Sequence, residues 1–196
     1  MRKNKKNFIE HFKKRLKETF SYLKEIKKYF LAAFLIFFLF VFVGYVFSEN
    51  FSFLDKMLLK IIEETKGMSG IELFFFIFKN NLLICFFTIL LGVLLSIFTM
   101  MVAIYNGILL GYVLRKLVIS DRLLEIWRIF PHGIFELPAI FISLALGLKI
   151  GLFVFFRKKK ERYFDVLTKS LNVFFFIVLP LLFIAAIIES ILIIYL

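Results

Sequence analysis

The sequence has few of the residues that soluble enzymes use for chemistry. Its 196 residues include one cysteine, Cys85, two histidines and three prolines. A lone cysteine forms no disulfide within the chain and no cysteine-based metal site, so we interpret Cys85 as a small apolar packing residue. No H-E-x-x-H motif, serine–histidine–aspartate order or activated cysteine is recognisable. We therefore expect no catalytic activity, no metal and no cofactor, and keep an intramembrane metal-dependent enzyme only as a weak alternative.

The composition instead favours a membrane protein. Hydrophobic residues make up 62% of the chain, and phenylalanine alone occurs 30 times, whereas soluble domains are about 45–50% apolar. The mean hydropathy is +0.93. The formal net charge of +12 sits mostly beside apolar runs, where basic residues set topology and attract anionic lipids. We expect an all-α integral membrane protein of the multi-pass class and no nucleic-acid partner.

Residues 1–29 form a basic amphipathic segment. Apolar residues recur in it at helical spacing, at Phe8, Phe12, Leu16, Phe20, Leu23 and Ile26. Lysines and arginines lie between them, which predicts a helix on an anionic membrane surface. We expect two parts: this cytoplasmic arm, and a single transmembrane domain over 30–196. The first apolar run is too long for a cleavable signal peptide and should remain as a span.

The apolar runs predict five membrane spans, at residues 30–47, 80–100, 101–118, 134–156 and 172–196. Between the first two, a mixed polar segment has one apolar stripe and predicts a surface helix. Ser69 and Glu72 fit a capping box, followed by a short interfacial helix at 71–78. Pro131 should begin the fourth helix. A re-entrant hairpin is the alternative for 80–118.

Charge asymmetry predicts the orientation. Segment 1–29 carries eleven Lys/Arg against three acids, and 157–169 carries six against two. The positive-inside rule places both in the cytoplasm, which requires an even number of crossings between them. Four of the predicted spans lie between the two segments. We expect a cell-membrane protein with a cytoplasmic N-terminus and an extracytoplasmic C-terminus.

Polar side chains inside the spans are functional candidates, because the bilayer penalises them. The predicted cluster consists of Asn80, Asn81, Asn106, His132, Glu136 and Glu189. His132 and Glu136 are four residues apart and share a helix face. With the predicted spans, three segments bring polar groups to a similar depth near the outer surface. The cluster fits a structural hydrogen-bonded lock, a docking site for a partner or ligand, or a metal site.

Paired glycines predict close helix packing. Gly107 and Gly111 form a G-x-x-x-G motif on the third span, and Gly147 and Gly151 form another on the fourth. Such spacing allows two helices to approach closely. We favour packing within one chain over a dimer face, although a homo-oligomer stays open.

Three sequence blocks resemble the stage II sporulation protein M family. They are Tyr105-Asn106-Gly107-Ile108-Leu109-Leu110-Gly111, Pro131-His132-Gly133-Ile134-Phe135-Glu136-Leu137-Pro138 and Gly147-Leu148-Lys149-Ile150-Gly151. Phe78-Lys79-Asn80-Asn81 is similar to the family's F-x-x-N-N element, one residue shorter, and Ala185-Ala186-Ile187-Ile188-Glu189 to its A-A-x-x-E. The resemblance implies a five-span membrane protein that holds envelope enzymes in place, as the namesake does in spore-forming bacteria.

We therefore expect a non-enzymatic scaffold that recruits membrane or envelope proteins through its outer polar cluster and its basic cytoplasmic arm, with anionic lipids bound at that arm. The alternative is a transporter or permease-like subunit. In that case His132, Glu136, Asn106 and Glu189 would line a polar path through the bilayer.

Overall fold

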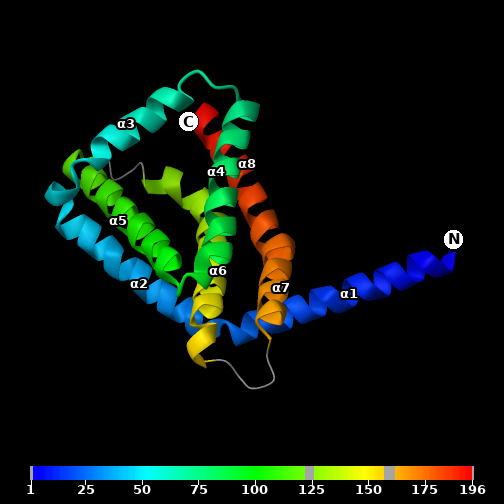
Figure 1. Ribbon diagram of the computed structural model, residues 1–196. Helices are drawn as coiled ribbons and strands as arrows, with labels where there is room; N and C mark the ends of the chain where they lie inside the picture. Colours follow the sequence, from blue (N-terminus) through cyan, green and yellow to red (C-terminus); the bar gives the residue numbers. More distant parts are fainter. Residues whose placement is uncertain (1, 122–125, 157–161, 196) are drawn as a thin grey trace.

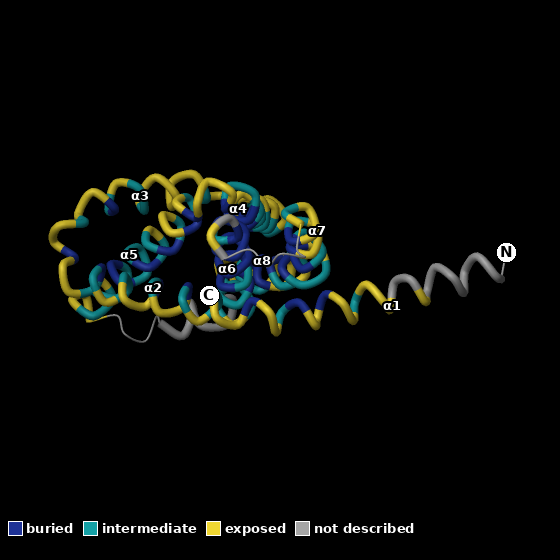
Figure 2. Tube along the Cα trace, turned by 60° about the horizontal axis from the view of Figure 1, so that its bottom comes forward, coloured by how far each residue is buried: buried dark blue, intermediate teal, exposed yellow. Residues whose placement is uncertain are grey.

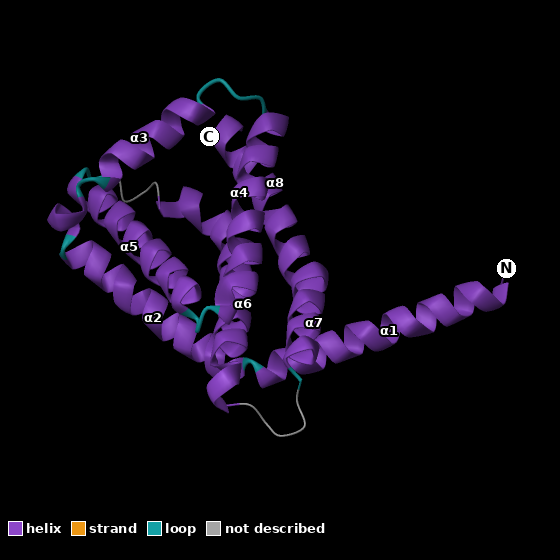
Figure 3. Ribbon diagram, in the orientation of Figure 1, coloured by secondary structure: helices purple, strands orange, loops and turns teal. Residues whose placement is uncertain are grey.

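The computed structural model describes residues 2–121, 126–156 and 162–195; within these ranges the side chains of 2–9, 11–12, 126–132, 154 and 156 are not described. The described part is helical and contains no strand (Figure 3). Its helices are α1 (Arg2–Glu25), α2 (Lys27–Val46), α3 (Leu54–Thr65), α4 (Gly70–Leu90), α5 (Ile97–Ile119), α6 (Ile126–Phe156), α7 (Tyr163–Val173) and α8 (Leu179–Tyr195). The all-α fold class is confirmed.

Five helical segments of the described chain are long and apolar enough to cross a membrane. They are Lys27–Val46, Gly70–Val93, Ile97–Ile119, Gly133–Phe153 and Tyr163–Tyr195. The prediction of a multi-pass protein with five spans is therefore confirmed. The C-terminus and the junction of α1 with α2 lie at opposite ends of the bundle (Figure 1). We call these the α3 end, where the C-terminus lies, and the α1 end.

The spans form two groups that meet near the α1 end. Helices α2 and α5 pack most extensively as a pair, and α4, α6 and α8 form the second group. The ring of Phe37 on α2 meets that of Phe141 on α6, with centroids 5.1 Å apart and nearly perpendicular. Toward the α3 end the two groups separate, and α3 crosses that end of the molecule (Figure 1).

Helix α6 is the centre of the bundle. In its membrane-spanning part 61% of residues are buried, against 17–28% in the other four spans. Helices α2, α4, α5 and α8 surround it, so its side chains contact protein where the other helices also face lipid. Figure 2 shows this buried core beside the exposed trace of α3.

The second and third spans differ from their predicted limits. Helix α4 begins at Gly70 and continues through 79–81, so the predicted interfacial helix at 71–78 is its first two turns. Two features explain the early start: the capping box at Ser69 is present, and Lys79 and the two asparagines do not interrupt a helix that packing holds. The chain turns at Leu91–Ser96, where Leu95 and Ser96 have left-handed φ angles of 52° and 64°, and not at residue 100. Residues 80–118 therefore form two helices, each long enough to span.

The helix that carries the fourth span, and the fifth span itself, also begin earlier than predicted. Helix α6 starts at Ile126, so Pro131 lies inside it and does not begin it. The ribbon of α6 bends in its first turns (Figure 1), and prolines cause such bends because they donate no backbone hydrogen bond. The fifth span begins at Tyr163 and not at 172. A π-helical turn at Phe174–Val178 precedes Pro180 and accommodates that proline.

Candidate functional site

Glu136 on α6 and Glu189 on α8 lie together in the half of the bundle nearer the α3 end. The two carboxyl groups are close enough to interact electrostatically, and both residues are only partly exposed. Among the described residues no basic side chain forms an ion pair with either. Two like charges at one site in a low-dielectric medium disfavour each other, so the pair is a costly polar feature of the spans.

Cys85 and Ser143 extend this acidic pair toward the α1 end. The thiol of Cys85 on α4 lies within hydrogen-bonding reach of the Ser143 hydroxyl and within electrostatic range of Glu136. Both residues are 1% exposed. The Ser143 hydroxyl also donates a 2.9 Å hydrogen bond to the Ala139 carbonyl, one turn earlier on α6. Four polar groups from three helices therefore meet at one site.

The asparagines do not all join this group. Because α4 begins at Gly70, Asn80 and Asn81 lie ten residues inside the helix, about 15 Å from its start, and not at its outer end. Asn81 shares a helix face with Cys85, whereas Asn80 is exposed and donates to the Asn81 side chain at 3.3 Å. Asn106 donates a 2.8 Å hydrogen bond to Val102 of its own helix.

The side chain of His132 lies outside the described residues. Its backbone belongs to α6, one turn before Glu136, so the shared face follows from helix geometry. Among the described side chains no three His, Cys, Asp or Glu residues gather closely enough to hold a metal ion. The metal interpretation of His132 and Glu136 stays untested.

The paired glycines lie at contacts between helices of this chain. A methyl group at Gly107 would come within 2.6 Å of the Phe37 carbonyl oxygen, and one at Gly111 would collide with the Val41 carbonyl. On α6, Gly147 faces the Thr88 carbonyl and Gly151 faces the Ser96 turn. Glycine is thus required where α5 meets α2 and where α6 meets the α4–α5 turn.

A polar clamp joins α3 to the end of α5. Tyr112 donates a 2.6 Å hydrogen bond to Asp55, and the Lys116 ammonium lies 2.9 Å from the other oxygen of that carboxylate. These two bonds, first that from Tyr112 and then that from Lys116, hold the pKa of Asp55 below its usual value. The sequence separation of 57 residues leaves no local signal for this contact.

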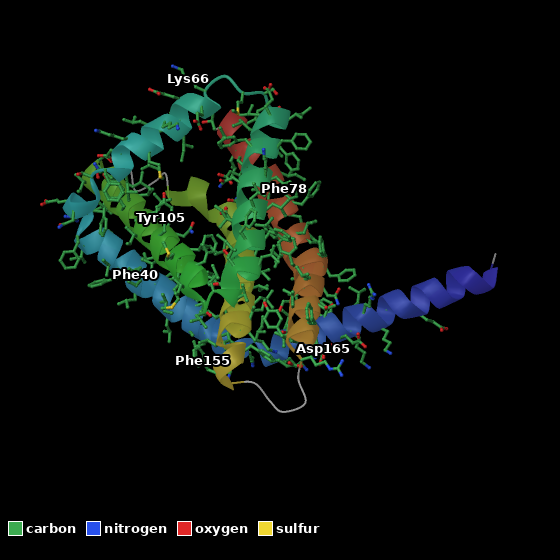
Figure 4. The ribbon with its side chains drawn as sticks, viewed as in Figure 1. Phe40, Lys66, Phe78, Tyr105, Phe155 and Asp165 are labelled. Carbon is green, nitrogen blue, oxygen red and sulfur yellow. The ribbon has the colours of Figure 1, made fainter. Side chains whose placement is uncertain are left out.

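Beyond the clamp, the second half of α3 is exposed on every side. Leu59 and Ile62 are 58% and 59% exposed, and Lys60, Glu63 and Glu64 are exposed beside them. Lys66, at the start of the turn into α4, lies at the extreme of this end (Figure 4). Within the described ranges no helix packs extensively on α3. The clamp therefore positions a mixed apolar and charged surface on which no described helix packs extensively.

Comparison with known proteins identifies the family. A family model for stage II sporulation protein M matches residues 33–192. An uncharacterized protein of Methanocaldococcus jannaschii is 30% identical over 154 residues, covering 70% of this chain and 68% of that protein. No solved structure matches the chain significantly. The chain therefore belongs to the stage II sporulation protein M family.

Proposed function

We propose that this protein is a non-enzymatic membrane scaffold that recruits a membrane or envelope protein through α3. The carrying observation is the exposed second half of α3, held in place by the Asp55 clamp. An amphipathic helix that exposes Leu59 and Ile62 presents more apolar surface than a solvated loop needs. Because the clamp fixes its base, α3 offers a preorganised surface, which reduces the entropy lost on binding.

The expected orientation of the protein in the membrane predicts the side on which α3 contacts its partner. The basic arm and the segment around 157–169 belong in the cytoplasm by the positive-inside rule. One crossing then puts α3 outside, and the fifth crossing puts the C-terminus outside as well. Helix α1 runs away from the bundle at the opposite end (Figure 1). Its exposed Lys13, Lys14, Arg15 and Lys17 suit it to anionic lipid on the cytoplasmic leaflet.

The chemistry of α3 indicates the kind of partner. Its exposed surface combines aliphatic side chains with lysines and glutamates of both signs, and a partner needs an apolar patch with a mixed charged rim. The exposed part of α3 is less than two helical turns long, and this small size indicates a partner that is itself held at the membrane. Membrane anchoring raises the effective concentration and makes a small interface sufficient.

A photo-activatable amino acid at Leu59 or Ile62 tests this proposal in native membranes. We expect one protein adduct of defined mass from both positions. The yield of this adduct should fall when Asp55→Asn releases the clamp, because α3 then loses its fixed position. Leu31 on α2 is the matched control, since it is also 58% exposed but faces lipid near the α1 end. We expect Leu31 to give lipid adducts alone. The same result at Leu59 and Ile62 would overturn the proposal.

The Glu136–Glu189 pair favours the alternative, a transporter or permease-like subunit. Two neighbouring carboxyl groups in spans are the usual chemistry of proton or cation paths. Two observations disfavour a continuous polar path. The amide of Asn106 donates to the backbone of its own helix, and Lys149 lies near the opposite end of α6 from Glu136. Purified protein in liposomes with a pH-sensitive dye distinguishes the two: an acid-driven proton flux that Glu189→Gln abolishes would support transport.

A further inference from the structure

A second polar site lies at the α1 end, where α1 crosses α7. A cavity of about 270 Å³ opens there, lined by Glu18, Thr19, Ser21, Tyr22, Glu25, Lys169 and Asn172. Small-molecule sites are typically about 300–1,000 Å³, so this volume suits a small polar group. Asp165 marks the beginning of α7 beside α1 in Figure 4.

Buried groups give this cavity a fixed wall. The Lys149 side chain of α6 is 9% exposed, and its ammonium lies 2.9 Å from the Glu25 carboxylate. The same ammonium lies 3.9 Å from the centre of the Tyr22 ring. The Tyr22 hydroxyl reaches the Val166 carbonyl and the Ser170 hydroxyl on α7, each at 3.4 Å. Contacts from α6 and α7 thus hold Tyr22 and Glu25 of α1, although only the lysine of the charge pair is buried.

Opposite charges remain at the cavity after these pairs are formed. Lys149 neutralises Glu25, whereas no described residue forms an ion pair with Glu18 on α1 or with Lys169 on α7. Both are exposed toward the opening. The site therefore presents one carboxylate and one ammonium from two different helices. Its charge pattern complements a zwitterion, because each ligand charge then meets one of opposite sign.

The position of the cavity near the start of the fifth span suits a lipid head group. Lys169 is six residues into α7, so it lies about 9 Å along the helix from its start. Helix α1 leaves the bundle sideways at this level (Figure 1), as an interfacial helix does.

We propose that this cavity binds the head group of a phospholipid that carries both a phosphate and a primary ammonium, as in phosphatidylethanolamine. The ammonium donates to Glu18, with Ser21 and Asn172 as further acceptors, and Lys169 contacts the phosphate. A quaternary ammonium has no N–H to donate, so a choline head group is disfavoured. A head group with negative charge alone meets Glu18 unfavourably. This inference concerns the opposite end of the molecule from α3 and does not rest on the proposed function.

Native mass spectrometry of the full chain tests the proposal, with equal amounts of phosphatidylethanolamine, phosphatidylcholine and phosphatidylglycerol that share the same acyl chains. We expect the protein to retain phosphatidylethanolamine several-fold more than phosphatidylcholine, whereas the basic residues of α1 should hold phosphatidylglycerol in every variant tested. Glu18→Gln and Lys169→Gln should each remove that preference. Lys24→Gln is the matched control, because Lys24 is exposed on α1 but does not line the cavity, and it should keep the preference.

Folding is followed separately by the melting temperature without added lipid, which the exposed Glu18 and Lys169 should affect little. Phosphatidylethanolamine should raise the wild-type melting temperature, and soluble glycerophosphoethanolamine should not. Equal retention of phosphatidylethanolamine and phosphatidylcholine, or an equal loss in Lys24→Gln, would overturn the head-group site. An equal shift with the soluble compound would overturn its assignment to a lipid.

Discussion

The phenol of Tyr112, near the end of α5, donates a 2.6 Å hydrogen bond to the carboxylate of Asp55 on α3. Tyr112 is 1% exposed, so a buried side chain of a span holds a surface helix that otherwise packs on little. Lys116, one turn later, completes the clamp at 2.9 Å. This contact makes α3 a fixed part of the α3 end, and the proposed docking surface depends on it.

The clamp predicts a pH dependence of stability. Its hydrogen bonds lower the pKa of Asp55 in the folded protein below the ordinary 3.8. A carboxyl group with a lowered folded pKa contributes stability above its unfolded pKa, and loses that contribution as the pH falls through the folded value. Asp55→Asn should therefore melt below wild type at pH 7 and at pH 5, with the difference shrinking as the pH falls below 3.8 toward the lowered pKa of the folded protein. A difference that is constant from pH 7 to pH 3 would show that the carboxylate charge is not involved.

The Lys149–Glu25 pair predicts unequal effects of removing its two members. Glu25→Gln leaves a charged lysine that is 9% exposed, and an unsatisfied buried group typically costs about 1–3 kcal/mol. Lys149→Met removes the buried charge and leaves Glu25, which is 46% exposed, in contact with water, so we expect less than about 1 kcal/mol. Melting temperatures in one detergent measure the order. A larger loss for Lys149→Met would mean that packing of the lysine stem outweighs its charge.

The α2–α5 contact predicts a large effect of a single methyl group. In Gly111→Ala the new methyl meets the Val41 backbone, which no side-chain rotation relieves, so we expect a loss of about 3 kcal/mol or more. Gly133→Ala is the control, since among the described residues its methyl would meet only Leu137, at 3.9 Å, and alanine favours a helix by up to about 1 kcal/mol. Thermal unfolding in detergent compares the two. Equal stability of both variants would contradict the close approach of α2 and α5.

Membrane-impermeant maleimide labelling tests the orientation. Cys85 is 1% exposed, so it should contribute little background. We expect Lys66→Cys, beyond α3, to be labelled in intact cells, and Lys13→Cys, on α1, only after the membrane is opened. The reverse pattern would place the basic arm outside and contradict the charge-based topology, whatever the role of α3.

Hydrophobicity and local capping predicted the number of spans and the restart at Ser69, because both depend on neighbouring residues. Span limits were less predictable. Lys79 and the two asparagines after it suggest the end of a helix. In the structure α4 continues through them, because it is held by packing on α6 and α8. The Lys149–Glu25 contact joins residues 124 positions apart, and a single sequence carries no sign of such a pairing. Glu136 and Glu189 were selected because bilayers penalise charge, and the fold does bring those two together.

An experimental structure in lipid nanodiscs, read at the space between Glu136 and Glu189, tests the scaffold account most directly. A scaffold needs this pair to be dry and held by neighbouring polar groups such as Ser143, and that is the result we expect. A water-filled passage from Glu189 toward Asn106, or an ion bound beside His132, would contradict the scaffold and favour transport.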